Sequence, residues 1–168
     1  VIGTCFEYGL QNGCLSEDME TKPVTSYGLA KDTLRKFLFE LQKQFDVILK
    51  WPRLFYVYGE GQSQHSLLEQ LKRAIASQTE TFNMSGGEQL RDYLPVERVA
   101  EYLVKIALQQ RVVGAINCCS GQPISIRKFV ENYLAELHAK IELNLGYYPY
   151  PDYEPMAFWG EIKKLATW

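Results

Sequence analysis

The sequence predicts an α/β protein with a mainly parallel sheet. Short apolar segments typical of buried strands, such as "VIGTCFEYG" and "GAINCCSG", alternate along the chain with longer segments that have the spacing of amphipathic helices. The chain has 168 residues and a hydrophobic content of 46%. That is enough to bury the core of one domain, or of a domain with an extension.

The first third of the chain reads as strand, helix, strand. The opening strand runs into a polar loop that ends at Ser26, a possible helix cap, and a helix begins near Tyr27. Apolar residues then recur at helical spacing over about five turns, at Leu34, Phe37, Leu38, Leu41 and Phe45. The segment "FDVILKWPRLFYVYG" follows as two short apolar pieces divided at Pro52, the first a buried strand and the second an extended piece.

The rest of the chain continues the alternation. Helices are predicted for "SLLEQLKRAIASQ", for the segment that begins at Pro95, and for "SIRKFVENYLAELHAK", with the strand "GAINCCSG" before the last. The helix after Pro95 is expected to bury Val96, Val99, Ala100, Leu103, Val104 and Ala107. The aromatic tail "LGYYPYPDYEPMAFWGEIKKL" has little periodicity, and we expect it to close a core rather than to form a carbohydrate platform.

Composition excludes several classes of partner. The formal charge is −2 and no run of like charges occurs, so neither nucleic acid nor a membrane is an expected partner. No apolar run of membrane length and no signal peptide is visible. For this reason we expect a reducing, cytoplasmic location. The cysteines follow no C-x-x-C pattern, so we expect no metal site. They are Cys5, Cys14, Cys118 and Cys119.

One pair of side chains has the spacing of a possible catalytic pair. Tyr27 and Lys31 lie at i and i+4, one helical turn apart on the same face. A nearby ammonium favours the phenolate, and this can bring a tyrosine into the range of a general acid or base. Such a pair also occurs by chance, and by itself it is more typical of two ordinary surface residues. Thr4 stands at the end of the opening strand, where ligands of parallel sheets usually bind.

Several separated segments resemble one family in order and spacing. The segments "GTCFEYG", "YGLAK", "PRLFYVYGEGQ", "RDYLPVERVAEYL" and "GAINCCSGQPISIRKFV" are similar to those of the extended short-chain dehydrogenase/reductase family of nucleotide-sugar epimerases, dehydratases and reductases. They cover nearly the whole chain. The resemblance implies the C-terminal part of a doubly wound, Rossmann-like parallel sheet with a smaller α/β substrate domain. It also implies an NAD or NADP cofactor and a nucleotide-sugar substrate.

The resemblance implies a role for each matching residue. In this family the tyrosine of Y-x-x-x-K transfers the proton, the lysine binds the nicotinamide ribose and lowers the pKa of the tyrosine, and a Ser or Thr holds the sugar oxygen. These positions are Tyr27, Lys31 and Thr4. The segment beside the nicotinamide corresponds to Leu54 and Phe55. The resemblance further places Arg91 at the diphosphate, and Tyr56 where the family often has an asparagine close to it.

The resemblance also implies a division of the chain and an upstream part. Residues 1–58 would belong to the cofactor domain and residues 59–168 mainly to the substrate domain, with 93–120 returning to the cofactor sheet. The chain has no glycine-rich dinucleotide loop, so we expect the family's first hundred or so residues, with the main cofactor site, to lie outside it. The chain alone is therefore expected to be inactive. The full protein is expected to form a homodimer through the helix of Tyr27.

The residues after Thr4 narrow the expected reaction. Dehydratases of this family have Asp-Glu directly after the hydroxyl residue, and the fucose-synthase type has a Cys two places after it, whereas this chain has Cys5 and Phe6. Phe6 cannot exchange a proton, and Cys5 is expected to pack in the core. We therefore expect oxidation or reduction at C4 of a dTDP-linked 4-keto-6-deoxy hexose. A C4 epimerase and a non-catalytic scaffold that binds a sugar nucleotide remain as alternatives.

Overall fold

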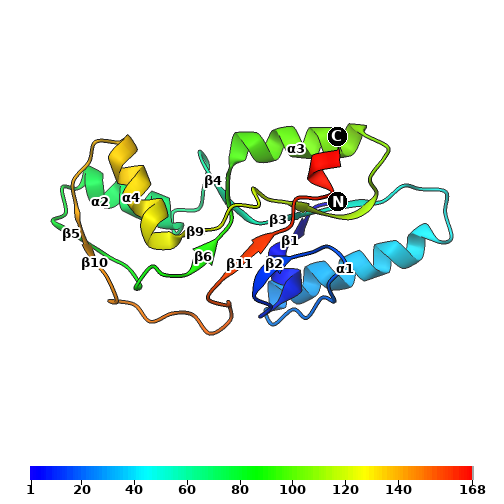
Figure 1. Ribbon diagram of the computed structural model, residues 1–168, viewed down its shortest axis with the longest axis horizontal. Helices are drawn as coiled ribbons and strands as arrows, with labels where there is room; N and C mark the ends of the chain where they lie inside the picture. The colour runs from blue at the N-terminus through cyan, green and yellow to red at the C-terminus, as the bar shows by residue number, and fades with distance from the viewer. Residues whose placement is uncertain (168) are drawn as a thin grey trace.

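The largest sheet of the protein has three parallel strands, in the order β1-β3-β8. In the computed structural model, which describes residues 1–167, these strands are β1 (Gly3–Thr4), β3 (Lys50–Leu54) and β8 (Gly114–Cys118). Helix α3 (Val96–Leu108) contacts β3 and β8, and helix α1 (Ser26–Gln42) contacts β1. Figure 1 shows the two helices on opposite faces of the sheet. We call β1, β3, β8, α1 and α3 together the sheet lobe, and its parallel sheet between helices confirms the predicted α/β class.

A second group of elements lies at the other end of the long axis in Figure 1. It contains helices α2 (Leu67–Ala76) and α4 (Ile126–Glu136), and the parallel pair β5 (Thr81–Asn83) and β10 (Glu142–Asn144). We call it the helix-pair lobe. Its buried core consists of Leu68, Leu71, Phe82, Met84, Val130 and Leu134.

The remaining elements of the fold are short. They are η1 (Cys5–Tyr8), β2 (Gly13–Leu15), β4 (Tyr56–Tyr58), β6 (Leu90–Arg91), β7 (Tyr93–Pro95), β9 (Ile124–Ser125), β11 (Phe158–Gly160) and η2 (Leu165–Thr167). Strand β4 pairs with β7 and β11 with β2, both in parallel, whereas β6 and β9 are antiparallel. Because β4 continues directly from β3, the strand that ends in the sheet lobe leads straight into the space between the lobes.

The start of α1 is fixed by two contacts with neighbouring segments. The N-cap is Thr25, not Ser26 as predicted, and its hydroxyl accepts a hydrogen bond of 3.0 Å from the Gly28 N–H. A Cβ atom on Gly28 would come within 2.6 Å of the carbonyl oxygen of Phe6. Only glycine therefore lets the first turn of α1 lie directly against η1, and this brings Tyr27 close to the end of β1.

The prediction of a break at Pro52 was wrong. Strand β3 runs through Pro52, which lies opposite Ile116 of β8. Proline cannot donate to a ladder, but β1 pairs with β3 only from Arg53 onward, so Pro52 lies where β3 has a partner on one side. The preceding apolar residues Val47 and Ile48 are exposed and form no strand.

The apolar faces of two helices are less buried than predicted. Helix α1 ends at Gln42, before Phe45, and Leu34 and Phe37 are 41% and 61% exposed. Helix α3 buries Val99 as predicted. Its expected inward residues Ala100, Val104 and Ala107 are exposed, and Ile106 lies in the core instead. Both helices contact a narrow three-stranded sheet, which covers only part of a wide apolar stripe.

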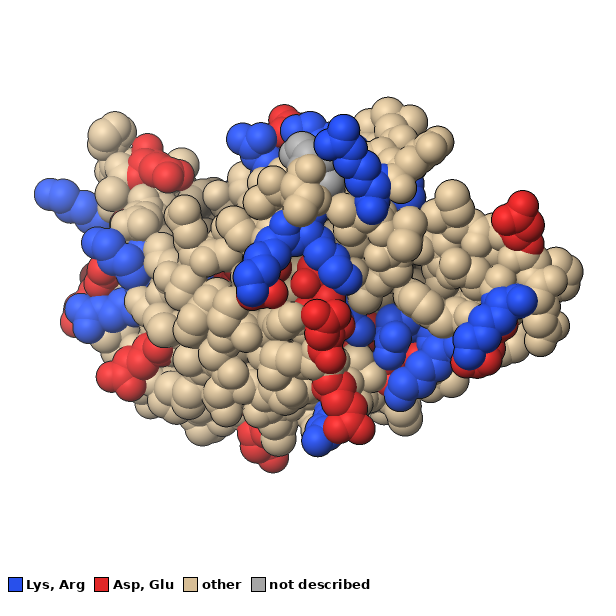
Figure 2. Space-filling model, turned by 45° about the vertical axis from the view of Figure 1, so that its right-hand side comes forward, with Lys and Arg blue, Asp and Glu red and all other residues tan. Residues whose placement is uncertain are grey.

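The aromatic tail follows the surface between the lobes before it enters the core. Phe158 in β11 is buried, as expected for a segment that closes a core. Tyr147, Tyr148, Tyr150 and Tyr153 are exposed, contrary to that expectation, because the tail before β11 has little regular structure. On the face shown in Figure 2, basic and acidic side chains lie next to one another without a continuous area of one sign. None of the described helices is long and apolar enough to cross a membrane.

Candidate active site

Thr4 ends strand β1 at the carboxyl edge of the three-stranded sheet, opposite Leu54 of β3. Its Oγ1 atom accepts a hydrogen bond of 3.3 Å from the Phe6 N–H, and its own N–H donates to Glu7 Oε1 at 2.9 Å. Thr4 thereby caps η1 with both its side chain and its main chain. The Oγ1 atom is the acceptor in the contact with Phe6, so this contact does not use the hydroxyl proton of Thr4.

A buried ionic network supports η1 from below. The Glu7 carboxylate is 0% exposed and accepts hydrogen bonds from Trp51 Nε1 at 2.9 Å and Arg53 Nε at 2.8 Å. Arg53 also donates to the hydroxyl of Tyr8 at 2.8 Å, and Tyr8 donates to Asn117 Oδ1 at 2.7 Å. Burial raises the pKa of Tyr8 to about 12, so its phenol stays neutral. Through this network, β3 and β8 hold the turn that carries Thr4.

Tyr27 and Lys31 lie in the first turns of α1, beside η1. Tyr27 is 55% exposed, and the Lys31 Nζ atom lies 5.9 Å from the centroid of its ring. The Lys31 ammonium donates to the carbonyl of Ile2 at 3.1 Å, which ties it to β1 near Thr4. The Phe6 ring packs edge-on against Tyr27, with centroids 6.3 Å apart. These contacts place Tyr27 and Lys31 beside β1 and the turn that follows Thr4, and we call Thr4, Tyr27 and Lys31 together the edge site.

Leu54 and Phe55 lie at the end of β3, next to the edge site. Leu54 pairs with Thr4 on one side and Cys118 on the other, and it is half-buried. The Phe55 side chain is buried against Tyr8 and Phe158, with centroids 6.5 and 6.2 Å away. The expected contact of these two residues with a nicotinamide stays a prediction.

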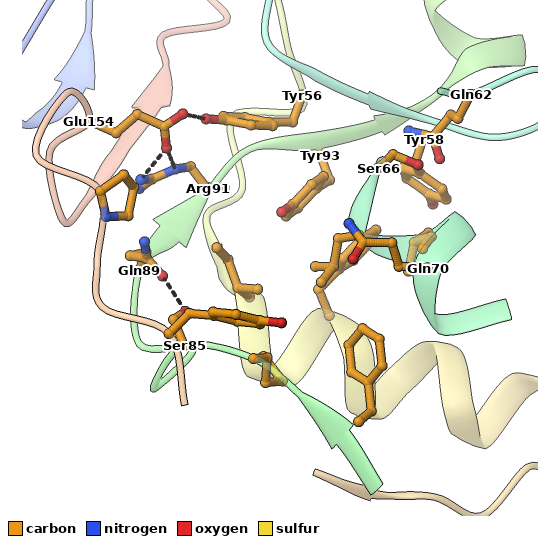
Figure 3. A pocket seen from close by; sticks show the side chains of 18 of the residues that line it. Tyr56, Tyr58, Gln62, Ser66, Gln70, Ser85, Gln89, Arg91, Tyr93 and Glu154 are labelled. Atoms are coloured by element: carbon orange, nitrogen blue, oxygen red, sulfur yellow. Dashed lines mark hydrogen bonds and ion pairs between the residues drawn. The ribbon is translucent and has the colours of Figure 1, made fainter. Parts of the chain in front are cut away.

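A pocket of about 460 Å³ lies between the helix-pair lobe and the short strands β4, β6 and β7. Figure 3 shows Tyr56, Arg91 and Glu154 at one end of it, and Gln62, Ser66 and Gln70 at the other. Its walls come from β4, α2, β5, the segment around β6, α4 and the tail. We call this cavity the lobe pocket.

Arg91 is almost completely enclosed at its end of the lobe pocket. Its side chain is 1% exposed, and it forms an ion pair of 2.8 Å between Nη2 and Glu154 Oε2. The Nη1 atom donates to the carbonyls of Leu90 and Met156 at 2.9 and 3.3 Å. The guanidinium also stacks over the ring of Phe158 at 4.7 Å. Carboxylate and carbonyl oxygens thus already surround Arg91.

Tyr56 is the second partner of Glu154. Its hydroxyl donates to Glu154 Oε1 at 2.7 Å, as Figure 3 shows. Burial raises the pKa of Tyr56 and the charge of Glu154 raises it further, so Tyr56 acts as a neutral donor. Sequence analysis missed Glu154, because it lies in the irregular tail, 63 residues from Arg91, and belongs to no motif that we identified.

At the opposite end of the lobe pocket, two polar oxygens have no partner within the described residues. They are Gln62 Oε1 and Ser66 Oγ, which are buried and form no hydrogen bond. Ser66 is the N-cap of α2, yet its hydroxyl does not cap the helix. Unpaired buried oxygens of this kind are costly unless a ligand or water satisfies them.

The edge site and the lobe pocket adjoin through Phe6. The Phe6 ring contacts Tyr27 on one side and Tyr56 on the other, with centroids 6.3 Å away in each case. A ligand with one end at Arg91 could therefore extend past Phe6 towards Tyr27. Such an elongated site suits a molecule with a charged or polar end and a reacting end.

The cysteines give no sign of a metal centre in the described part of the chain, residues 1–167. All four thiols are free, and no group of three or more His, Cys, Asp and Glu side chains converges there. Burial raises the pKa of Cys5 and of Cys118 to about 12. Cys5 lies in the core with Tyr8 and Phe158, packed as expected.

The chain belongs to the NAD dependent epimerase/dehydratase family, whose model matches residues 1–119. This confirms the resemblance seen in the sequence, and with it the expected Rossmann-like class and the nicotinamide class of cofactor used by the family. A relative from Aggregatibacter actinomycetemcomitans, dTDP-6-deoxy-L-talose 4-dehydrogenase (NAD(+)), is 30% identical over 165 residues, covering 95% of this chain and 59% of the relative. An uncharacterized UDP-glucose epimerase of Bacillus subtilis (strain 168) is 23% identical over 158 residues, 94% of this chain and 49% of that protein.

Solved structures share the fold. UDP-N-acetylglucosamine 4-epimerase from Methanobrevibacter ruminantium M1 has a TM-score of 0.89 at 22% identity, covering 98% of this chain and 54% of that one. UDP-glucuronic acid 4-epimerase from Bacillus cereus, in complex with UDP-glucuronic acid and NAD, has a TM-score of 0.85 at 24% identity, covering 99% and 53%. The chain thus spans a little over half of the length of these structures, and 59% and 49% of the two relatives.

Proposed function

We propose that this chain carries the proton-transfer and substrate-binding residues of an NAD(P)-dependent enzyme that oxidises or reduces a nucleotide sugar at C4. The observation that supports this proposal is the position of Tyr27 and Lys31 in the first turns of α1, where Tyr27 packs against Phe6 in the turn that directly follows Thr4 at the carboxyl end of β1. A dTDP-linked 4-keto-6-deoxy hexose is the proposed substrate, since the Aggregatibacter relative is named for a dTDP-6-deoxy sugar.

In this proposal each residue of the edge site has a defined task. The Tyr27 hydroxyl exchanges a proton with the oxygen on C4 of the sugar, because it is exposed and stands next to an ammonium. The Thr4 hydroxyl donates a hydrogen bond to the same oxygen, since its Oγ1 is an acceptor in the contact with Phe6. Lys31 favours the phenolate of Tyr27 when the proton leaves.

The residues present fit a nicotinamide cofactor on the side of α1 and β3. Among the described residues Lys31 has the Ile2 carbonyl as its one hydrogen-bond acceptor, so further N–H groups of its ammonium remain for ribose hydroxyls. Leu54 and Phe55 are proposed to flank the cofactor from the end of β3. When bound, the nicotinamide supplies or accepts the hydride at C4.

The lobe pocket is proposed to hold the nucleotide diphosphate. Its volume of about 460 Å³ suits a small ligand. Arg91 and Tyr56 would face the diphosphate, while the unpaired oxygens of Gln62 and Ser66 would accept hydrogen bonds from the nucleoside. The sugar would then lie beside Phe6, whose ring contacts Tyr56 on one side and Tyr27 on the other.

The proposal extends to the organisation of the whole protein. We propose that residues 1–58 and 93–120 belong to the cofactor domain and that the remaining residues form the substrate domain, because β1, β3 and β8 share one sheet. The exposed Leu34 and Phe37 on α1 support a homodimer through this helix. Light scattering of the full-length protein should show twice the mass of one chain, and a monomer would contradict the dimer.

The experiment incubates the full-length protein with dTDP-4-keto-6-deoxy hexose and either NADH or NADPH. The proposal predicts consumption of one cofactor, followed by absorbance, and a product reduced at C4 by NMR. Interconversion of C4 epimers of a nucleotide sugar without net consumption would instead establish an epimerase. Binding of sugar nucleotide without either reaction would contradict the proposed catalysis and favour a scaffold.

A further inference from the structure

Glu154 occupies the place at Arg91 that an anionic ligand would need. Its carboxylate accepts hydrogen bonds from Arg91 Nη2 at 2.8 Å and Nε at 3.3 Å, so it faces the edge of the guanidinium that usually grips a phosphate or carboxylate. The opposite Nη1 group is directed at the carbonyls of Leu90 and Met156. A diphosphate that approached this arrangement would meet a negative charge before it met a free N–H group.

The Glu154 carboxylate is held from two sides and lies in the pocket wall. Tyr56 donates to its second oxygen at 2.7 Å, so each carboxylate oxygen has a donor. The Glu154 side chain is 13% exposed, in contrast to 1% for Arg91, and it lines the lobe pocket. Figure 3 shows it entering this end of the pocket from the tail. The ion pair is therefore at the wall of the cavity, where a ligand can reach it.

Glu154 can leave Arg91 by rotation of its side chain alone, while the tail two residues further on stays tied to β6 by the hydrogen bond of 2.8 Å from the Leu90 N–H to the Met156 carbonyl. Glu154 stands in an irregular stretch of the chain before β11. Arg91, in contrast, is fixed in β6 by pairing with β9. Movement of the carboxylate would break side-chain contacts only and leave the strand that carries Arg91 in place.

We propose that Glu154 is a competing anion that sets the affinity of the lobe pocket for nucleoside diphosphates. This inference rests on the proposed function, in which the diphosphate binds at Arg91. Binding is an exchange: the Glu154 carboxylate leaves Arg91 and Tyr56, and a phosphate oxygen takes its place on the same donors. The exchange selects ligands that bring a strong anion, because a neutral ligand cannot displace the ion pair.

The test measures binding of UDP and dTDP to the full-length protein by calorimetry, with uridine and thymidine as ligands that lack phosphate. Glu154→Gln keeps the size of the side chain and an acceptor for Tyr56, but it removes the competing charge. We expect the variant to bind the diphosphates about tenfold more tightly and the nucleosides as the wild type does. Glu88→Gln is the matched control, since Glu88 is exposed, contacts Tyr150 and does not touch Arg91.

Two results would overturn the inference. Unchanged or weaker diphosphate binding by Glu154→Gln would show that Glu154 does not compete, and equal tightening for nucleosides would show that it acts through the shape of the pocket. Arg91→Met separates this failure from a failure of the proposed function. If that variant binds diphosphates as the wild type does, the diphosphate does not bind at Arg91 at all.

Discussion

The edge site and the lobe pocket differ in how exposed their polar side chains are and in how many partners these side chains already bind. At the edge site Tyr27 is 55% exposed, and Lys31 is anchored by a hydrogen bond to a main-chain carbonyl. In the lobe pocket Arg91 is 1% exposed and is bound to Glu154 and two carbonyls. A proton transfer at Tyr27 therefore displaces nothing, whereas an anion can bind at Arg91 only by exchange.

The difference has its origin in the segments that carry the two sites. Tyr27 and Lys31 are spaced by a single helix, so their approach needs no other part of the chain. Arg91 lies where β6, β9 and the tail meet, and its guanidinium N–H groups are bound by the carbonyls of Leu90 and Met156 and by the Glu154 carboxylate. The comparison predicts that substitutions at the edge site change turnover and that those in the lobe pocket change affinity.

The largest expected effect is on turnover when the Tyr27 hydroxyl is removed. Tyr27→Phe keeps the ring that contacts Phe6 but cannot transfer a proton, so kcat should fall about 10²- to 10⁴-fold. The thermal midpoint should stay unchanged, because the side chain is exposed. Tyr147→Phe serves as the control, since Tyr147 is also exposed and lies in the tail. Equal loss of activity in both variants would remove Tyr27 from the chemistry.

The second largest effect is on stability, when the buried Glu7 carboxylate beneath the edge site loses its charge. Glu7→Gln leaves the Arg53 guanidinium buried without its counter-charge, and the free energy of unfolding should fall by about 3–5 kcal/mol. Urea unfolding measures this free energy. Glu40→Gln removes an exposed partner of Lys43 and should change little. A similar small change for Glu7→Gln would show that the network does not hold the turn of Thr4.

Much of the edge site could be predicted from the sequence, whereas the ion pair that Arg91 forms in the lobe pocket could not. Tyr27 and Lys31 follow from a local helical period, and Thr4 from the end of a strand. Arg91 was singled out from its motif, but its ion pair with Glu154 depends on the path of a tail without periodicity. Contacts between residues so far apart leave no regular pattern in a single sequence.

The errors in the predicted fold have a related cause. Pro52 was expected to divide two segments because proline breaks ladders, yet the short β1 leaves that position without a partner on one side. The apolar stripes of α1 and α3 predicted helices correctly, but not which residues become buried. Burial depends on the width of the sheet beneath each helix, and that width is a property of the tertiary fold.

The smallest expected effect is on the acid stability of α1. Burial alone would raise the pKa of Asp32, but hydrogen bonds from Lys36 and Arg35 outweigh it and lower that pKa. A carboxylate with a lowered pKa stabilises the folded state above its unfolded value of about 4, and this is lost as the pH falls through the folded pKa. Asp32→Asn should therefore reduce stability at pH 7 more than at pH 3 in urea unfolding. Asp18→Asn, at an exposed position, should show no such difference.

The most direct test of the division between the two sites is a binding titration of dTDP and UDP with Tyr27→Phe and Arg91→Met in the full-length protein. The account predicts that Tyr27→Phe binds the nucleotides as the wild type does, although it cannot turn over a sugar. Arg91→Met should lose at least about tenfold in affinity, because a charged donor is removed. If Tyr27→Phe loses nucleotide affinity as strongly as Arg91→Met, the two sites do not have separate tasks and the account is wrong.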